Sequence, residues 1–251
     1  MKKIDRTGEI GVNNLGYVME IISYHNYDDI DVKFESGYIS YHNTYRNFKN
    51  GEIKDFCAKD IYGVACLGQG KYFKKKSDAS TPMYRTWVNM LMRCYNKQYK
   101  QKYITYQECT ACEEWLNFQN FAKWYVNNYY EIDEPLNLDK DILQKNNKLY
   151  SPDTCLLVPQ RINKLFIKGD SCRGSYYIGV TYLNKINKYV ARCNTITNRQ
   201  YLGVFETEEA AFTAYKDYKE NYIKQIAEEY KNKIPEKLYN ALYTWKVQKT
   251  D

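Results

Sequence analysis

The sequence of 251 residues has no long apolar run. A membrane-spanning helix needs about 18 or more predominantly apolar residues, and no stretch of this chain approaches that length. The opening residues, MKKIDRTG, are basic, but the apolar core of a secretory signal peptide does not follow them. These absences argue against a membrane protein or a secreted protein, and we expect a cytoplasmic one.

A nucleotide-binding loop is missing as well. Residues 63–80, GVACLGQGKYFKKKSDAS, contain three glycines and a basic run. Glycines expose backbone N–H groups that can bind phosphate, but the Gly-Lys-Ser/Thr ending of a P-loop is absent. We interpret this segment as a linker with a basic tip that follows a β-rich module at 1–62.

Histidine is scarce in this chain, whereas tyrosine is abundant. There are 2 histidines and 28 tyrosines. Tyrosine packs its ring while its hydroxyl stays in water, which suits small domains with thin cores and also surfaces that stack on bases. The net charge of +7 and the pI of about 8.8 suit a nucleic-acid partner. A soluble protein with a lysine-rich surface would have the same values.

The 8 cysteines are expected to be reduced inside a cell. Cys109 and Cys112 form a Cys-x-x-Cys pair, with Cys94 before it and Cys155 after it. Four thiolates in a tetrahedral arrangement would bind structural zinc. Packed thiols and a redox pair are the alternatives, because the outer spacings match no common zinc finger. The remaining cysteines are interpreted as structural: Cys57, Cys66, Cys172 and Cys193.

Residues 1–62 are predicted to form a small β-meander or a partly open barrel. Strands are expected at 16–24, 30–36 and 38–45, because β-branched and aromatic residues alternate with polar ones between turn-forming residues. The tripeptide Tyr-His-Asn occurs twice, at 24–26 and at 41–43, and the two copies resemble a faint repeat.

A second module is predicted at 81–168. Apolar residues at helical spacing indicate helices over 81–98 and 113–128. Thr81 is expected to cap the first of them, with Pro82 at its first helical position. Strands at 136–143 and 151–158 with a turn between them and a short helix after them complete a ββα order.

A third module is predicted at 169–251. Three strands, at 176–183, 188–196 and 200–205, precede a long helix. Thr207 is expected to cap this helix at its start. Three antiparallel strands packed on one helix form an α+β unit, so the α+β class is expected for the whole chain.

Residues 84–163 resemble a widespread group of phage-encoded proteins related to HNH nucleases. The motifs that carry this resemblance are YRTWVNMLMRCYN, CEEWLNFQNFAKW, LNLDKDI and NNKLYSPDTC. An HNH nuclease binds one metal ion on a hairpin and a helix, and its histidine activates the attacking water. The resemblance places Asp139 at the first acidic position, Lys140 at the histidine position, Thr154 near the middle ligand and Asn163 near the last.

The general-base histidine is therefore absent from the hairpin. A lysine is charged at neutral pH, so Lys140 is expected to bind a phosphate rather than to accept a proton. Asp139 and Asp141 would share one face of a continuous strand and could bind Mg²⁺ together. Three interpretations stay open: an inactive HNH-like scaffold, a metal-dependent homing endonuclease, and a chance resemblance.

The segments YYIGVTY, KYVARCN and RQYLGVFETEEAAFTAYKDY resemble the Apetala-two/ethylene-response-factor DNA-binding domain over residues 176–230. That family reads the major groove of DNA with its sheet. Arginines that are usual in the family are replaced by Ile178 and Thr181, and a tryptophan by Tyr201, so its sequence preference is not carried over. The resemblance and the nearby charge imply the following contact residues: Thr181, Lys185, Lys188, Tyr189, Arg192, Asn194, Arg199 and Tyr201.

The function expected from these features is double-stranded DNA binding in phage or mobile-element biology, within an infected or lysogenic bacterial cell. The whole chain also resembles an uncharacterised phage and prophage family with this three-part layout. The alternatives are the metal-dependent endonuclease and an inhibitor of host defence that binds a host protein. A basic sheet face that is merely solvated would leave DNA binding without support.

Overall fold

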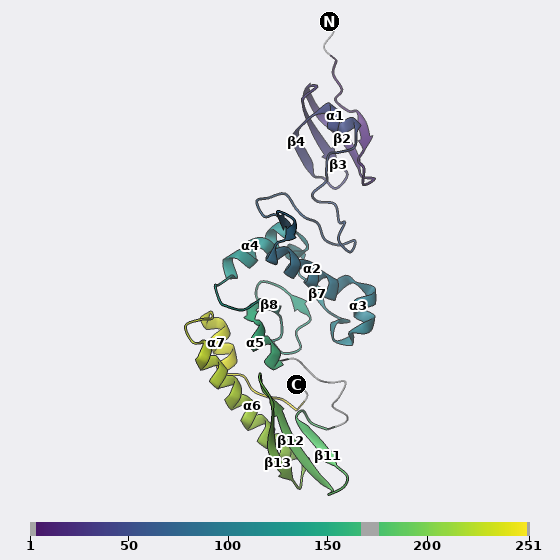
Figure 1. The fold of residues 1–251 in the computed structure, drawn as a ribbon. Coiled ribbons are helices and arrows are strands. Elements are labelled where there is room, and N and C mark those ends of the chain that lie inside the picture. Colours follow the sequence, from purple (N-terminus) through teal and green to yellow (C-terminus); the bar gives the residue numbers. More distant parts are fainter. Residues whose placement is uncertain (1–3, 167–175, 250–251) are drawn as a thin grey trace. The chain divides into compact units, whose positions relative to one another are not determined.

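A computed structural model describes residues 4–166 and 176–249 of the chain (Figure 1). The chain forms two compact units, residues 1–107 with 111–124, and residues 108–110 with 125–251. The described part belongs to the α+β class, as predicted. None of its helices is both long enough and apolar enough to cross a membrane. The boundary expected at 168/169 lies outside the described residues, and so does Cys172.

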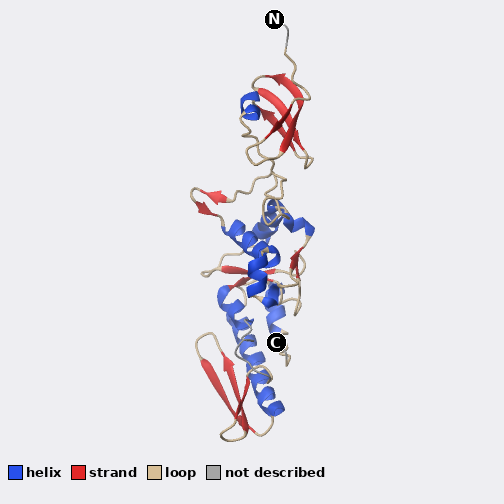
Figure 2. Ribbon diagram, turned by 90° about the vertical axis from the view of Figure 1, so that its right-hand side faces the viewer, coloured by secondary structure: helices blue, strands red, loops and turns tan. Residues whose placement is uncertain are grey.

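The first unit begins with an antiparallel meander of four strands, paired in chain order and drawn in red in Figure 2. The strands are β1 (Ile10–Val12), β2 (Val18–Asn26), β3 (Asp29–Phe34) and β4 (Ile39–Asn43). Helix α1 (Tyr45–Lys49) follows, and the Thr44 hydroxyl caps it by accepting a hydrogen bond from the Asn47 amide at 3.1 Å. The core of this sheet contains Met19, Ile21, Ile30, Val32, Phe34, Tyr45, Phe48 and Ile53.

The segment after the meander contains helices and three strands of two residues each. Its elements are β5 (Lys75–Lys76), β6 (Ala79–Ser80), α2 (Pro82–Tyr95), α3 (Lys97–Lys102), η1 (Ile104–Tyr106) and β7 (Thr110–Ala111). Helix α2 starts where the sequence predicted, because Thr81 accepts from the Tyr84 amide at 3.3 Å and Pro82 occupies the first turn.

The helix predicted over 113–128 is instead two elements, η2 (Glu113–Leu116) and α4 (Phe118–Asn128). The break falls at Asn117, whose backbone is extended and whose side chain accepts from the Gln119 amide at 2.9 Å. Cys66 pairs with the chain at this point, because its amide donates to Leu116 O and its carbonyl accepts from the Phe118 amide. A tertiary backbone pairing therefore interrupts a continuous helical pattern.

The second unit contains a ββα segment and a three-stranded sheet. The first comprises β8 (Leu136–Asp139), β9 (Leu149–Tyr150), β10 (Leu156–Pro159), α5 (Gln160–Asn163) and η3 (Lys164–Phe166), with β8 antiparallel to β10. The second comprises β11 (Val180–Leu183), β12 (Lys188–Asn194) and β13 (Arg199–Phe205), followed by α6 (Glu208–Tyr230) and α7 (Glu236–Tyr243). Thr207 caps α6, as predicted, by accepting from the Ala210 amide at 3.2 Å.

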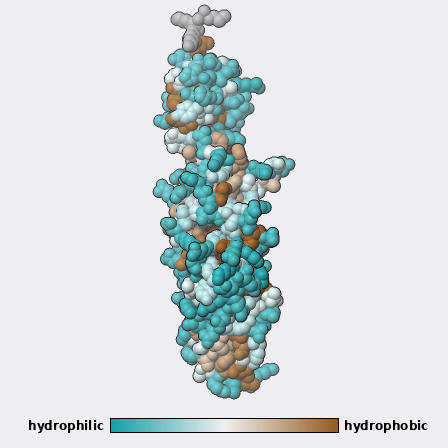
Figure 3. Space-filling view, turned by 90° about the vertical axis from the view of Figure 1, so that its left-hand side faces the viewer, coloured by the Kyte–Doolittle hydropathy of each residue, from teal (hydrophilic) through white to brown (hydrophobic). Residues whose placement is uncertain are grey.

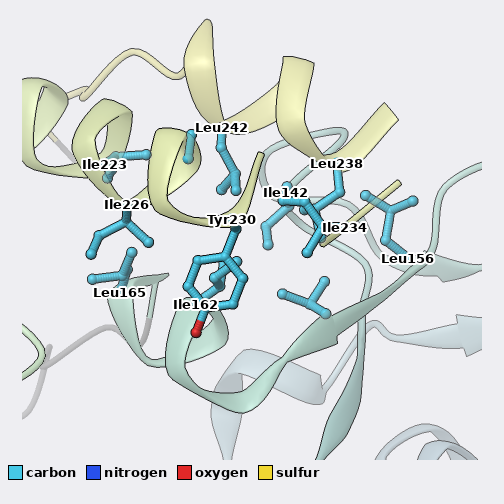
Figure 4. Close-up of a cluster of buried hydrophobic side chains, with 12 residues drawn as sticks. Ile142, Leu156, Ile162, Leu165, Ile223, Ile226, Tyr230, Ile234, Leu238 and Leu242 are labelled. Carbon is cyan, nitrogen blue, oxygen red and sulfur yellow. The ribbon is translucent and has the colours of Figure 1, made fainter. Parts of the chain in front are cut away.

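Helix α6 serves two cores. Its first half packs on the β11–β13 sheet through Ala211, Phe212 and Tyr215. Its second half, with α7, packs on the ββα segment in a cluster drawn in Figure 4. The cluster contains Ile142, Leu156, Val158, Ile162, Leu165, Ile223, Ile226, Ala227, Tyr230, Ile234, Leu238 and Leu242.

The length of α6 explains this sharing. A helix of 23 residues is about 35 Å long at 1.5 Å per residue, which exceeds the extent of a small three-stranded sheet. Its apolar positions continue past the sheet and must be covered by other residues. The residues predicted as separate modules at 81–168 and 169–251 consequently contribute to one hydrophobic cluster.

Shortening a side chain of this shared cluster is expected to destabilise the second unit. Leu238 is fully buried, so Leu238→Ala should lower the free energy of unfolding by about 2–5 kcal/mol. Chemical unfolding followed by circular dichroism measures the change. Asn240→Ala, at an exposed position of the same helix, is the matched control and should change stability by about 0.5 kcal/mol or less. Equal effects of the two substitutions would contradict the packing.

Candidate nucleic-acid interface

The β11–β13 sheet has two different faces. Ala191 and Cys193 of β12 are fully buried, and they belong to the core that packs against α6. Side chains of a strand alternate between its faces. Arg192, which lies between them, and Asn194 therefore point away from the helix. Figure 2 shows α6 on one side of this sheet, and the face of Arg192 is the opposite one.

The face away from α6 brings together most of the residues predicted to contact DNA. Arg192 lies opposite Tyr201, and Asn194 lies opposite Arg199. A register shift between Ala191 and Arg192 places Tyr201, and not Leu202, opposite Arg192. Cross-strand neighbours have Cβ atoms about 4.5–5.5 Å apart, so the two arginines, the asparagine and the tyrosine form one compact group.

Thr181 of β11 lies on the same face, opposite Val190 of the middle strand β12. Val190 is only 1% exposed, whereas Thr181 is exposed. Tyr201 and Val204 of β13 expose 54% and 40% of their surface. The face thus combines cations, amide and hydroxyl groups, and apolar surface.

The charge of this sheet has one sign. Residues 176–205 contain four basic residues and no acidic residue. Neither Arg192 nor Arg199 forms a salt bridge with a residue of the described part of the chain. Lys188, in contrast, pairs with Glu206 at 2.6 Å. Lys185 lies exposed in the turn between β11 and β12. The arginines are consequently the strongest candidates for contacting a negatively charged ligand.

One residue predicted for this face lies elsewhere. Tyr189 pairs with Tyr182 and Phe205 and packs against the core on the α6 side. Its ring centroid is 5.0 Å from that of Tyr182 and 6.0 Å from that of Tyr176. The alternation of side chains along β12 explains this position. Tyr189 is three residues from Arg192 and two from Ala191, so it shares the face of Ala191.

Apolar surface is also exposed at the end of the sheet where β11 turns into β12. Ile186 in that turn is 49% exposed. Figure 3, which faces the side drawn on the left in Figure 1, shows hydrophobic residues gathered at the lower end of the view, the end at which this sheet lies. Apolar side chains contact the methyl group of thymine in the major groove.

The ββα segment differs from the prediction at its acidic residues. The strand expected over 136–143 ends at Asp139. The Asp139 carboxylate accepts hydrogen bonds of 2.8 Å from the amides of Asp141 and Ile142, which turns the chain. Asp139 and Asp141 therefore do not lie two apart on one strand. Burial raises the pKa of the Asp139 carboxyl, and the two amide bonds offset that rise only in part.

Lys140 is an internal residue rather than a surface cation. It is 6% exposed, and its ammonium lies 2.8 Å from both oxygens of Asp141 and 2.6 Å from the carbonyl of Asn147. The Asn147 side chain returns a hydrogen bond of 3.1 Å to the Lys140 carbonyl. These bonds close the loop between β8 and β9. The expectation that Lys140 binds a phosphate is not met by this arrangement, because its donors are directed inward.

The remaining HNH-like positions are Thr154 and Asn163. The Thr154 hydroxyl lies 2.8 Å from the Leu149 carbonyl, to which it donates, and 2.9 Å from the Ser151 hydroxyl. Asn163 is the last residue of α5 and is half-buried. In the described residues, three ligand atoms from His, Cys, Asp or Glu approach within 4.8 Å of one another only at His25, Asp29 and Asp31.

The cysteines predicted to bind zinc are distributed over both units. Cys94 and Cys112 belong to the first unit, and Cys109 and Cys155 to the second, so neither unit alone supplies four thiolates. Cys94, Cys109 and Cys155 are buried. Burial raises the pKa of the Cys155 thiol to about 12, which favours its protonated form. Zinc at these positions stays a prediction.

Two cysteines without any predicted partner lie close together. The thiols of Cys57 and Cys66 influence each other's ionisation. Burial raises the pKa of both thiols, so they favour the protonated state. Cys193 packs in the core under β12, in agreement with a structural role.

Comparison of the chain with protein-family models, with curated proteins and with solved structures gives no match.

Replacing Lys140 should affect stability but not DNA affinity. Lys140→Met keeps the apolar stem and leaves the Asn147 carbonyl without its donor, which costs about 1–3 kcal/mol. Chemical unfolding measures this cost, and fluorescence anisotropy with duplex DNA measures the affinity of the folded variant. Lys148→Met, in the same loop and 44% exposed at its side chain, is the control. Weaker DNA binding by folded Lys140→Met alone would indicate a phosphate contact.

Proposed function

We propose that this chain binds double-stranded DNA with the face of the β11–β13 sheet that points away from α6. The observation that carries this proposal is the pairing of Arg192 with Tyr201 and of Arg199 with Asn194 across adjacent strands. The absence of acidic residues from 176–205 supports it, because a polyanion would meet no repulsion on this sheet.

The side chains of this face suit the chemistry of a DNA groove. Arginine donates two hydrogen bonds to guanine O6 and N7, and asparagine binds the N6 and N7 positions of adenine. Lysines at the edge of the sheet, such as Lys185, suit phosphates, which position a protein without reading sequence. The resemblance to the Apetala-two/ethylene-response-factor domain agrees with a sheet in the major groove. Binding is expected to tolerate many sequences, because the family's other arginines are replaced here.

The ββα segment is proposed to stabilise the protein rather than to cleave DNA. Asp139 is used for a turn, and Lys140 holds Asp141. No histidine lies in residues 84–163, so the segment has no imidazole to activate a water molecule. These observations favour a DNA-binding scaffold of phage type over the alternative of a metal-dependent HNH-type endonuclease.

Removing both arginines should weaken DNA binding. Arg192→Ala with Arg199→Ala is expected to cost about 1–3 kcal/mol for each arginine that reads a base. An arginine that binds phosphate instead should reduce the slope of log affinity against log salt by about 1. Fluorescence anisotropy with a labelled duplex at several salt concentrations measures both quantities.

The matched control removes the same charge from two exposed arginines elsewhere in the chain. Arg46→Ala with Arg85→Ala changes α1 and α2 and should leave affinity nearly unchanged. If the two double variants lose affinity equally, net charge explains the binding and the sheet face does not. If neither loses affinity, the proposed interface is wrong.

Supercoiled plasmid should stay intact when it is incubated with the protein and Mg²⁺ or Mn²⁺. The reason is that no general base accompanies Asp139 and that its carboxylate already accepts two amides. Agarose gels separate nicked from supercoiled plasmid. Nicking that disappears in Asp139→Ala and persists in Asp153→Ala, an exposed acid of the same segment, would favour the endonuclease instead.

A further inference from the structure

Both histidines of the chain lie at the same end of the N-terminal sheet. His25 stands near the end of β2 and His42 near the end of β4, and the two strands flank β3. Strand β3 begins at that same end with Asp29, and Asp31 follows on the same face of the strand. The two copies of Tyr-His-Asn therefore bracket a pair of carboxylates.

Strand irregularities direct both imidazoles toward these carboxylates. His25 is the extra residue where Tyr24 and Asn26 pair with Ile30 and Asp29. His42 lies at the irregularity between β3 and β4, and has a left-handed φ of 55°. Bulges redirect side chains, and a non-glycine residue with positive φ is uncommon. Both copies of the tripeptide thus depart from regular strand geometry beside the same two residues.

His42 holds both carboxylates in place. Its backbone amide donates to Asp31 Oδ1 at 3.0 Å, and its ring Nδ1 lies 3.0 Å from Asp29 Oδ1. An ionised carboxylate can only accept, so Nδ1 carries the proton of this bond. His42 is consequently an orienting residue for the pair.

His25 completes the group from the other side. Its Nε2 lies 3.7 Å from Asp31 Oδ2 and 3.2 Å from the Ser23 hydroxyl, which can donate to it. The ligand atoms of His25, Asp29 and Asp31 all lie within 4.8 Å of one another. The side chain of Asp31 is only 15% exposed, whereas that of His25 is 50% exposed. The cluster is therefore buried on the side of Asp31 and open to solvent on the side of His25.

We propose that His25, Asp29 and Asp31 bind one divalent first-row transition ion, with His42 as a positioning residue. Small movements, chiefly of the exposed His25 side chain, would bring the three atoms to the roughly 2.0–2.2 Å at which imidazole and carboxylate bind Zn²⁺. The imidazole favours a transition ion over Mg²⁺ or Ca²⁺, which prefer oxygen ligands alone. Three protein ligands leave a coordination position for water or for a donor from a partner molecule.

This inference is independent of DNA binding, because its residues belong to the first unit and the β11–β13 sheet belongs to the second. Long-range proton–nitrogen NMR of the full chain tests it directly. The chain has 2 histidines, so every imidazole signal reports on this cluster. Addition of ZnCl₂ should shift a ring nitrogen of His25, and the shift should reach saturation within a few equivalents. Zinc bound by cysteines alone would leave both imidazoles unchanged and would overturn the proposal.

Substitutions separate the roles of the residues. Removing an outer partner that orients a metal ligand usually lowers metal affinity by about 10–100-fold, which is the loss expected for His42→Ala. Asp31→Asn keeps an acceptor for the His42 amide but removes a ligand, so its loss should be at least as large. Both losses are read from the His25 signal.

The matched control is Asp28→Asn, which removes the same charge from the exposed neighbouring turn. It should bind Zn²⁺ as the unmodified chain does. Equal affinities of Asp31→Asn and Asp28→Asn would overturn the proposal, and so would a His25 signal that does not move at several equivalents of ZnCl₂. The unmodified chain alone decides the question if a variant fails to fold.

Discussion

The second unit depends on one helix that buries apolar side chains along its whole length. The first half of α6 covers the β11–β13 sheet, and its second half joins α7 in covering the ββα segment. A sheet of three strands buries little apolar surface by itself, and so does a short ββα segment. Because one rigid element is shared, each gains a larger core than it could build alone. The ββα segment is therefore stabilised mainly by its packing on α6 and α7.

The same constraint determines which face of the sheet is left for a ligand. With Ala191 and Cys193 committed to α6, the alternation of β12 presents Arg192 and Asn194 on the other side. No acidic residue lies between 176 and 205 to neutralise them. A stabilising core and a basic recognition surface thus arise from one strand pattern. Ala191 and Cys193 pack beneath the helix, whereas Arg192 and Asn194 carry polar groups on the opposite face.

Local signals in the sequence predicted much of the fold, whereas the errors arose from one contact between distant residues, from a family resemblance and from a competing local turn. Thr81 and Thr207 marked helix starts correctly because a cap involves only neighbouring residues. The helix over 113–128 was wrong because Cys66, far away in sequence, pairs at Asn117. Tyr189 was placed on the wrong face by a family resemblance, although the parity of β12 alone would have placed it correctly. The strand through Asp139 failed because a side-chain turn competed with the extended pattern.

The histidines show what sequence reading can and cannot detect. The repeated Tyr-His-Asn tripeptide was visible, but the bulges that bring His25 and His42 to Asp29 and Asp31 depend on strand pairing. An HNH site would hold its imidazole and carboxylates together in the ββα segment, where this chain has only the carboxylates. Imidazoles and carboxylates meet instead in the N-terminal sheet. If this chain uses a metal ion through histidine, the ion therefore belongs to the first unit, and DNA recognition by the second unit does not require it.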